Sequence, residues 1–201
     1  MKRKRLFSIL ALVPAILFSL HAAAQATPDS GSAAPAAAPH YAWKAFVGGG
    51  YTSINQVNQS RYGLIGVNLA LTRNWGRYFG LTADGAVYPH SLASGNPGNP
   101  TLDAVFFGPE VHGHIIDNWS VFARALLGGE HTGGENQTPK VSFAGGAGIG
   151  LEYDINTRWS LRAYGDDIAS SFSPINNSPQ LAYSPHMRRN SRAGVGVAFR
   201  F

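Results

Sequence analysis

Apolar and polar residues alternate along most of the chain from residue 41 to residue 201. The alternation falls into eight segments, which predict β-strands at 41–52, 62–72, 78–88, 102–115, 119–129, 141–153, 158–168 and 191–201. Because successive side chains of a strand point to opposite faces, each segment has one apolar face and one polar or small face. In the third segment, Leu81, Ala83 and Val87 share one face, and Thr82 and Asp84 lie on the other.

The connections between these segments alternate in length. Short ones lie at 73–77, 116–118 and 154–157, and longer ones, rich in Asn, Gly, Pro and Ser, lie at 53–61, 89–101, 130–140 and 169–190. An even number of strands joined by alternately short and long connections is typical of bacterial outer-membrane barrels. A soluble β-sandwich that buries its apolar faces would show the same alternation. Alternation by itself therefore leaves both folds open.

Aromatic residues gather at both ends of the predicted strands. Those at the short connections are Trp75, Trp119 and Trp159, and those at the opposite ends are Tyr51, Tyr62 and Tyr88. Membrane barrels carry aromatic girdles at both interfaces, so we interpret the six residues as two such girdles. The alternative is that the three tryptophans pack in the core of a soluble domain.

The glycine-rich stretch 142–154 invites comparison with a phosphate-binding loop. A dinucleotide fingerprint needs the spacing G-x-G-x-x-G between a strand and a helix. Here Gly146, Gly148 and Gly150 recur at every second residue, and no helical pattern follows them. We therefore interpret the glycines as the small face of a strand, where they leave room for larger neighbours.

The last predicted strand, "SRAGVGVAFRF", carries glycines on one face and ends on an aromatic residue. With Gly196, Phe199 and Phe201 it resembles the C-terminal assembly signal that the barrel-assembly machinery reads in outer-membrane proteins. Together with the strand count, this makes residues 41–201 resemble the small eight-stranded outer-membrane barrels typified by the transmembrane domain of OmpA.

This resemblance implies an all-β fold, an eight-stranded antiparallel up-and-down transmembrane β-barrel. It also implies a monomer that contacts outer-membrane lipid and lipopolysaccharide and that is inserted by the barrel-assembly machinery. OmpA-type proteins usually carry a periplasmic peptidoglycan-binding domain after the barrel. No such segment follows residue 201, so the resemblance does not extend to wall anchoring.

The N-terminal part of the chain predicts export. Residues 1–26 have a basic start, an apolar stretch over 6–20 and a small-residue site ending at Ala26, which is the layout of a signal peptide. The apolar stretch is shorter than the ~20 residues of a transmembrane helix. The Ala/Pro-rich stretch 27–40 has too little apolar bulk to fold and predicts a leader. The barrel domain would then span 41–201 and lie in the outer membrane.

The charge and the cysteine count exclude several functions. The chain has a formal net charge of +5 at pH 7, but four of its sixteen Lys and Arg residues and none of its eleven Asp and Glu residues lie in the first 26 positions. The remainder, with 12 basic and 11 acidic residues, gives no support for nucleic-acid binding, which needs a basic patch on the folded domain. Because the chain has no Cys, disulfides, thiol catalysis and cysteine zinc sites are excluded.

The inward faces of the predicted barrel carry four cations and four carboxylates: Lys44, Asp84, Glu110, Arg124, Glu152, Arg162, Asp166 and Arg200. An eight-stranded barrel is just wide enough for side chains to fill its interior, and balanced charges suit a closed plug. If the turn between the fourth and fifth strands is centred on Asp117, Glu110 and Arg124 lie opposite one another. We therefore predict that these two residues pair and that the barrel does not conduct.

Two other kinds of chemistry have weaker support. His112, His114 and Glu110 share one face and could bind a metal, but polar filling of the barrel is the simpler interpretation, and we expect no metal and no cofactor. Eight-stranded barrels also include a lipid A palmitoyltransferase and a lipid A deacylase, the latter with a His-x-Ser pair on one strand. The nearest match here is His90-Ser91, whose side chains would point to opposite sides.

The sequence therefore predicts a non-enzymatic barrel with a structural or surface-interaction role. The long connections would be its contact surface, and the longest, 169–190, places Arg188 and Arg189 where they could bind an anionic partner such as a lipopolysaccharide phosphate. A small or gated pore is the alternative, and a lipid-modifying enzyme is the third possibility.

Overall fold

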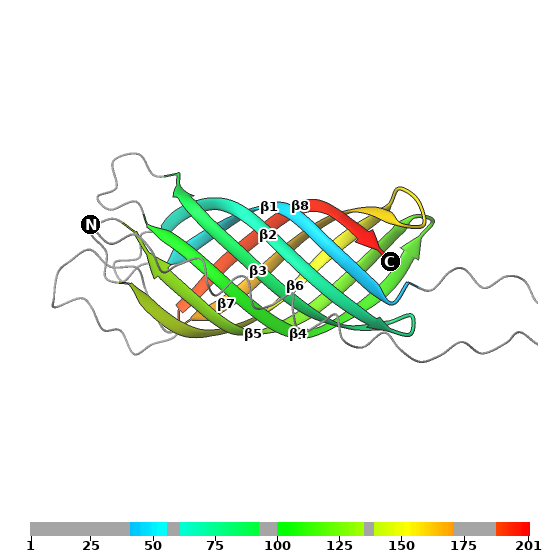
Figure 1. Cartoon of the computed structure of the whole chain (residues 1–201), viewed down its shortest axis with the longest axis horizontal. Coiled ribbons are helices and arrows are strands. Elements are labelled where there is room, and N and C mark those ends of the chain that lie inside the picture. The colour runs from blue at the N-terminus through cyan, green and yellow to red at the C-terminus, as the bar shows by residue number, and fades with distance from the viewer. Residues whose placement is uncertain (1–40, 56–60, 93–99, 135–138, 171–187) are drawn as a thin grey trace, which may run out of the picture. The chain divides into compact units, whose positions relative to one another are not determined.

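A computed structural model describes residues 41–55, 61–92, 100–134, 139–170 and 188–201. These residues form eight strands: β1 (Trp43–Asn55), β2 (Arg61–Trp75), β3 (Phe79–Ser91), β4 (Thr101–Ile116), β5 (Trp119–Gly133), β6 (Lys140–Asp154), β7 (Trp159–Ser170) and β8 (Arg188–Arg200). Each strand pairs antiparallel with the next, and β8 pairs with β1, so the sheet closes into a barrel (Figure 1). The predicted fold class is confirmed. The expected signal peptide, 1–26, and leader, 27–40, lie outside the described residues.

Most strands extend further toward the long connections than the sequence predicts. For example, β7 ends at Ser170 and β8 begins at Arg188, inside the segment expected as the longest connection. The prediction rests on the alternation of apolar and polar residues, which becomes irregular at these strand ends. The backbone hydrogen bonds between strands continue beyond the end of this alternation, because backbone groups pair whatever side chains the residues carry. Within the described ranges, no helix is long and apolar enough to cross a membrane.

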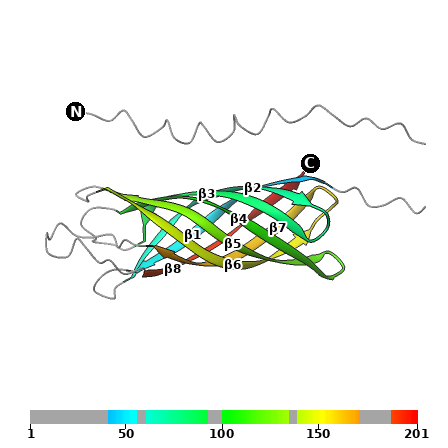
Figure 2. The same cartoon turned by 90° about the horizontal axis from the view of Figure 1, so that it is seen from below.

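The three short turns and the end of β8 lie at the same end of the barrel (Figures 1 and 2). Gly76 and Asp117 adopt positive φ angles of 68° and 44° in the first two of these turns, a conformation that Gly and Asp tolerate better than most residues. At the junction of β1 and β8, Trp43 and Phe201 exchange two backbone hydrogen bonds of 3.0 and 2.9 Å. The barrel therefore closes as far as the final residue of the chain.

The outer surface of the barrel is apolar on every strand. Large side chains such as Val67, Leu127 and Ile149 are more than half exposed, at 57%, 61% and 68%. The charged residues of the strands are, by contrast, mostly buried inside. A soluble sandwich buries its apolar faces and exposes its polar ones, so this inverted arrangement excludes the sandwich and fits a surface that contacts lipid.

The structure places most of the predicted girdle residues on this outer surface. Trp75, Trp119, Trp159 and Tyr51 are between 42% and 46% exposed near strand ends. Tyr88 is completely buried inside the barrel, so its assignment to a girdle is wrong. The prediction weighed only its position near a strand end, whereas alternation along β3 places it on the inward face.

Tyr62 lies in β2, but its side chain is outside the described part of the chain. The tryptophans at the short turns each contact a further aromatic ring. The ring centroids of Trp159 and Phe199 are 4.7 Å apart, and those of Trp119 and Tyr153 are 5.0 Å apart. These pairs join neighbouring strands at the end of the barrel that carries the turns.

Toward the long connections, the apolar outer surface gives way to polar pairs. Nδ1 of His131 on β5 lies 3.7 Å from a carboxylate oxygen of Asp103 on β4, and Arg189 on β8 forms an ion pair with Asp167 on β7. All four residues point outward and are at least partly exposed. They mark the upper edge of the apolar belt, where we expect lipid head groups to begin.

The resemblance of the final strand to an assembly signal predicts the effect of changing Phe201. Its ring stacks on Phe199 with centroids 6.0 Å apart. We expect Phe201→Ala, which keeps the backbone bonds to Trp43, to lower the amount of folded barrel in outer-membrane fractions. Folded protein is detected by its heat-dependent shift on gels. Phe201→Tyr, which keeps the aromatic ring, is the matched control and should accumulate normally. Equal accumulation of both variants would refute the assembly-signal interpretation.

Candidate functional site: the charged interior of the barrel

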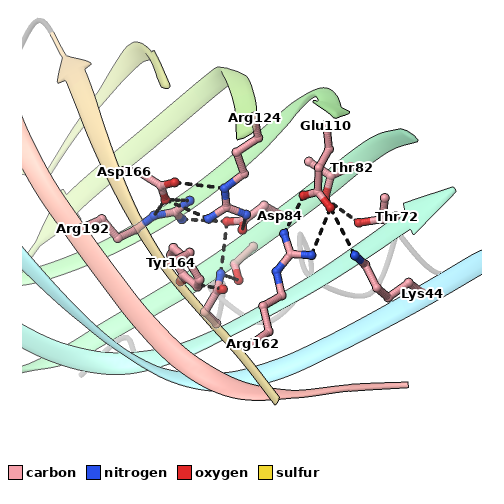
Figure 3. A network of polar contacts seen from close by, with 12 residues as sticks. Lys44, Thr72, Thr82, Asp84, Glu110, Arg124, Arg162, Tyr164, Asp166 and Arg192 are labelled. Carbon is pink, nitrogen blue, oxygen red and sulfur yellow. Dashed lines mark hydrogen bonds and ion pairs between the residues drawn. The ribbon is translucent and has the colours of Figure 1, made fainter. Parts of the chain in front are cut away.

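The interior of the barrel is built in layers, and the inward face of β7 shows their order. From the short-turn end, its inward residues are Ser160, Arg162, Tyr164, Asp166 and Ile168. A charged layer is thus followed by an aromatic one, a second charged layer and an apolar one. We call the two charged layers the lower network, near the short turns, and the upper network (Figure 3).

The lower network consists of Lys44, Glu110, Glu152, Arg162 and Arg200. The guanidinium of Arg162 donates two hydrogen bonds to the carboxylate of Glu110, at 3.0 and 2.5 Å. Lys44 Nζ lies between the two carboxylates, 3.3 Å from Glu110 and 2.9 Å from Glu152. Arg200 donates to the other oxygen of Glu152 at 2.5 Å. Each buried carboxylate therefore contacts at least two cations.

The upper network consists of Asp84, Arg124, Asp166 and Arg192. Arg124 donates two hydrogen bonds to Asp166, at 2.9 and 2.8 Å, and a third to Asp84 at 3.1 Å. Arg192 bridges the same two carboxylates, at 2.8 Å to Asp166 and 2.6 Å to Asp84. Such paired contacts between guanidinium and carboxylate groups are among the strongest in proteins. With two cations and two carboxylates, the upper network is electrically neutral.

Arg192 is the one member of the networks that the sequence prediction missed. It lies within the predicted strand 191–201 and has the same parity as Arg200, so alternation places it on the inward face. Alternation therefore suffices to identify Arg192 as an inward residue, although the predicted set of inward charges takes only Arg200 from this strand. The structure buries seven of the eight predicted charges inside the barrel, and the eighth, Arg200, has a side chain that is 20% exposed at the short-turn end.

The predicted pair of Glu110 with Arg124 is not formed, so that prediction is wrong. The strand register is as expected, since the two residues are direct partners across β4 and β5. The side chains turn away from each other, Glu110 to Arg162 and Lys44, and Arg124 to Asp166 and Asp84. The strand register determines which backbone positions are neighbours, but long side chains in a narrow barrel can reach residues on the opposite side of the barrel.

Glycines in β6 explain how Arg124 reaches Asp166. In register, Arg124 on β5 faces Gly148 on β6, which in turn faces Asp166 on β7. A side chain at Gly148 would overlap the carboxylate of Asp166, and one at Gly150 would overlap the ring of Phe122. The alternate glycines therefore leave the space in which residues of β5 and β7 meet, as the sequence interpretation proposed.

Aromatic rings separate the two networks. The ring of Phe122 lies 3.6 Å from Cζ of Arg162, in the lower network, and the ring of Tyr164 lies 4.3 Å from Cζ of Arg124, in the upper network. Phe46 packs edge-on against Tyr164 with ring centroids 5.9 Å apart. Each guanidinium thus stacks on an aromatic face, a favourable contact for a desolvated cation.

Beyond the upper network, the interior combines an apolar layer with buried polar residues such as Glu130 and Asn190. This layer comprises Ile54, Leu64, Tyr88, Leu102, Phe106, Leu126 and Ile168, all at most 2% exposed. The alternation along the strands predicts inward faces that are small or polar, so this apolar section is not expected from the sequence. Its consequence is a second barrier along the same axis, because an ion that passed the networks would have to cross this apolar layer.

The histidines considered as metal ligands do not converge. His112 Nε2 lies 3.4 Å from a carboxylate oxygen of Glu110 at the edge of the lower network, whereas His114 is exposed near the turn. Among the described residues, no group of three or more His, Cys, Asp or Glu side chains is arranged to hold a metal ion. In the described part of the chain, the polar interior is thus held together by ion pairs between its own side chains.

Comparison with known proteins gives structural matches only. No protein-family model matches the sequence, and no curated protein matches it. Neisserial surface protein A superposes with a TM-score of 0.63 at 10% identity, over 80% of this chain and 97% of that one. The chain has the fold of the small outer-membrane β-barrels.

A second small outer-membrane barrel of this fold is Ail, the attachment invasion locus protein of Yersinia pestis. It matches with a TM-score of 0.54 at 14% identity, over 79% of this chain and 97% of that one. Its complex with the heparin analogue sucrose octasulfate matches with a TM-score of 0.55 at the same identity and coverage. At these identities the likeness concerns the arrangement of the strands.

Removing one carboxylate of the lower network should destabilise the barrel. Glu110→Ala would leave Arg162 without its bidentate partner and Lys44 with a single carboxylate, at buried positions. The loss of one partner from a buried ion pair costs about 3–5 kcal/mol. We expect a shift of this size in the free energy of unfolding, measured by urea titration of the barrel in lipid vesicles.

The matched control is Asp103→Ala, which removes an exposed carboxylate paired with His131. Exposed pairs contribute at most about 1 kcal/mol. If the two substitutions changed the unfolding free energy equally, the lower network would have no special role in stability.

Filling the space at Gly148 should also destabilise the barrel. A methyl group there would overlap the Asp166 carboxylate and so disturb its bonds to Arg124. Overpacking of this kind costs about 1–3 kcal/mol, and we expect Gly148→Ala to lower the urea midpoint accordingly. Gly49→Ala is the control, because a side chain at Gly49 would meet open space. An unchanged midpoint for Gly148→Ala would mean that Asp166 moves aside without cost.

Proposed function

We propose that this protein is a closed outer-membrane barrel that acts through its outer surface, in a structural or surface-interaction role, and not as a pore or an enzyme. The observation that carries the proposal is the continuous filling of the interior. The lower ion network, an aromatic layer, the neutral upper ion network and an apolar layer follow one another along the barrel axis. Such an interior has little room for a solute path, whereas it supports a rigid cylinder.

In the orientation that we propose, the short turns face the periplasm and the long connections face the exterior, as in other outer-membrane barrels. The apolar belt would contact membrane lipid, and the polar pairs at its upper edge would meet the head groups of lipopolysaccharide. Export by residues 1–26, insertion by the barrel-assembly machinery and a monomeric state belong to the same proposal.

The surface role that we favour is contact with an anionic partner. Arg188 and Arg189 begin β8 next to the longest connection, and the side chain of Arg189 is 79% exposed even though it pairs with Asp167. The structure of Ail in complex with a heparin analogue, sucrose octasulfate, shows that a barrel of this fold can bind a sulfated ligand. The long connections that would complete such a surface lie largely outside the described residues.

Planar-bilayer recording tests the closed interior. We expect the purified barrel to insert without a steady conductance, because ions would have to break both networks and cross the apolar layer. A large and steady conductance in the wild type would overturn the proposal and make the protein a pore. Mass analysis of lipid A from cells that overproduce the protein addresses the enzyme alternative, and we expect no change in lipid A mass.

A further inference from the structure

The end of the barrel that carries the short turns contains a cavity of about 340 Å³. Its walls come from six of the strands and from two of the short turns, so it is the mouth of the barrel interior and not a groove on the outside. Lys44 and Glu152 of the lower network lie at its inner end. We call this space the turn-end cavity. The closed interior makes it a blind pocket and not the entrance to a channel.

The turn-end cavity is lined by more positive than negative charge. Lys44, Arg77 and Arg200 line it together with a single carboxylate, that of Glu152. Glu152 already accepts bonds from Lys44 and Arg200, at 2.9 and 2.5 Å. Lys44 also contacts Glu110, and Arg200 also pairs with Asp154, so both of these cations are already neutralised. Arg77, in the turn between β2 and β3, makes no ion pair with any described residue; its guanidinium only approaches the ring of Tyr78, at 6.0 Å. The cavity therefore offers a cation that is free to bind a ligand.

Neutral hydrogen-bonding groups complete the lining. Asn74, Ser120 and His112 each present a polar side chain to the cavity. Nε2 of His112 lies 3.4 Å from a carboxylate oxygen of Glu110, without a hydrogen bond to any described residue. At the rim, hydrogen bonds with Arg158 and Thr157 lower the pKa of the Tyr41 hydroxyl. Amide, hydroxyl and imidazole groups thus surround a net positive charge in a partly enclosed space.

We propose that the turn-end cavity binds an oxyanion, the phosphate or carboxylate group of a small soluble molecule, with Arg77 as its principal partner. Hydrogen bonds from a guanidinium to an oxyanion are strong, and they are stronger in an enclosed site than in bulk water. The volume lies at the small end of the range for ligand pockets, about 300–1,000 Å³. In the orientation proposed above, the ligand enters from the periplasm.

A phospholipid head group could present the same chemistry, and a second arginine distinguishes the two sources. Arg73 lies at the same end of the barrel but points outward, where its guanidinium stacks on Trp43 and Trp75 at 5.5 and 5.2 Å. A head-group phosphate at the membrane surface would meet Arg73, whereas a soluble anion in the cavity would meet Arg77. The two arginines form a matched pair for mutation.

The test is a titration of the full barrel, refolded in zwitterionic micelles and labelled with ¹⁵N. Inorganic phosphate, and in a second series acetate, is added against chloride at constant ionic strength while amide chemical shifts are followed. We expect saturable shifts at Lys44, His112 and Ser120. Arg77→Ala should weaken the apparent affinity about tenfold, which corresponds to the loss of one charged contact, and Arg73→Ala should leave it unchanged. A heat-dependent gel shift checks that both variants are folded.

Three results would overturn the proposal. The first is the absence of any saturable shift with either anion. The second is equal affinity in Arg77→Ala and the wild type. The third is a response that requires anionic phospholipid in the micelle and that weakens in Arg73→Ala, which would assign the positive charge at this end of the barrel to lipid head groups.

Discussion

The structure depends on one constraint, which is that a charge turned into a narrow barrel is costly unless it meets an opposite charge there. An unpaired ion in a buried space is far more costly than an exposed one. In this protein two separate networks meet the constraint for nine charged residues, each network with its own carboxylates shared between cations, whereas the buried Glu130 forms no ion pair with a described residue. The lower network joins strands β1, β4, β6, β7 and β8, and the upper one joins β3, β5, β7 and β8. The ion pairs of the interior thus also connect strands that are not neighbours in the sheet.

Small residues make these ion pairs between distant strands possible. The alternate glycines of β6 occupy positions between larger residues of β5 and β7, so that Arg124 can meet Asp166 across an intervening strand.

The outer surface of the barrel has a different requirement, because it must be apolar over the width of a membrane. Alternation along each strand lets one sequence satisfy both requirements, with a period of two residues separating the lipid-facing set from the ion-paired set.

Much of this arrangement could be predicted from the sequence, and the errors have specific physical causes. Strand number, connectivity and the identity of the inward charges follow from alternation, which is a local property. Tyr88 and Arg192 were misplaced or missed where alternation was not applied to the ends of the strands. The partners of Glu110 and Arg124 could not be predicted, because side-chain choice in the interior depends on the space left by residues of other strands. The apolar layer around Phe106 and Leu126 could likewise be identified by following the alternation of inward and outward residues to the ends of the strands.

The junction between β1 and β8 has a consequence for the way the barrel can open. β8 supplies Arg192 to the upper network and Arg200 to the lower one, while Asp84, Asp166 and Glu152 are held by β3, β7 and β6. Detaching β8 would therefore remove two positive charges from the interior and leave Arg124 as the one cation between Asp84 and Asp166 in the upper network. The junction is held electrostatically as well as by backbone hydrogen bonds, so a sheet of seven strands would carry an excess negative charge in its upper network until the eighth strand pairs.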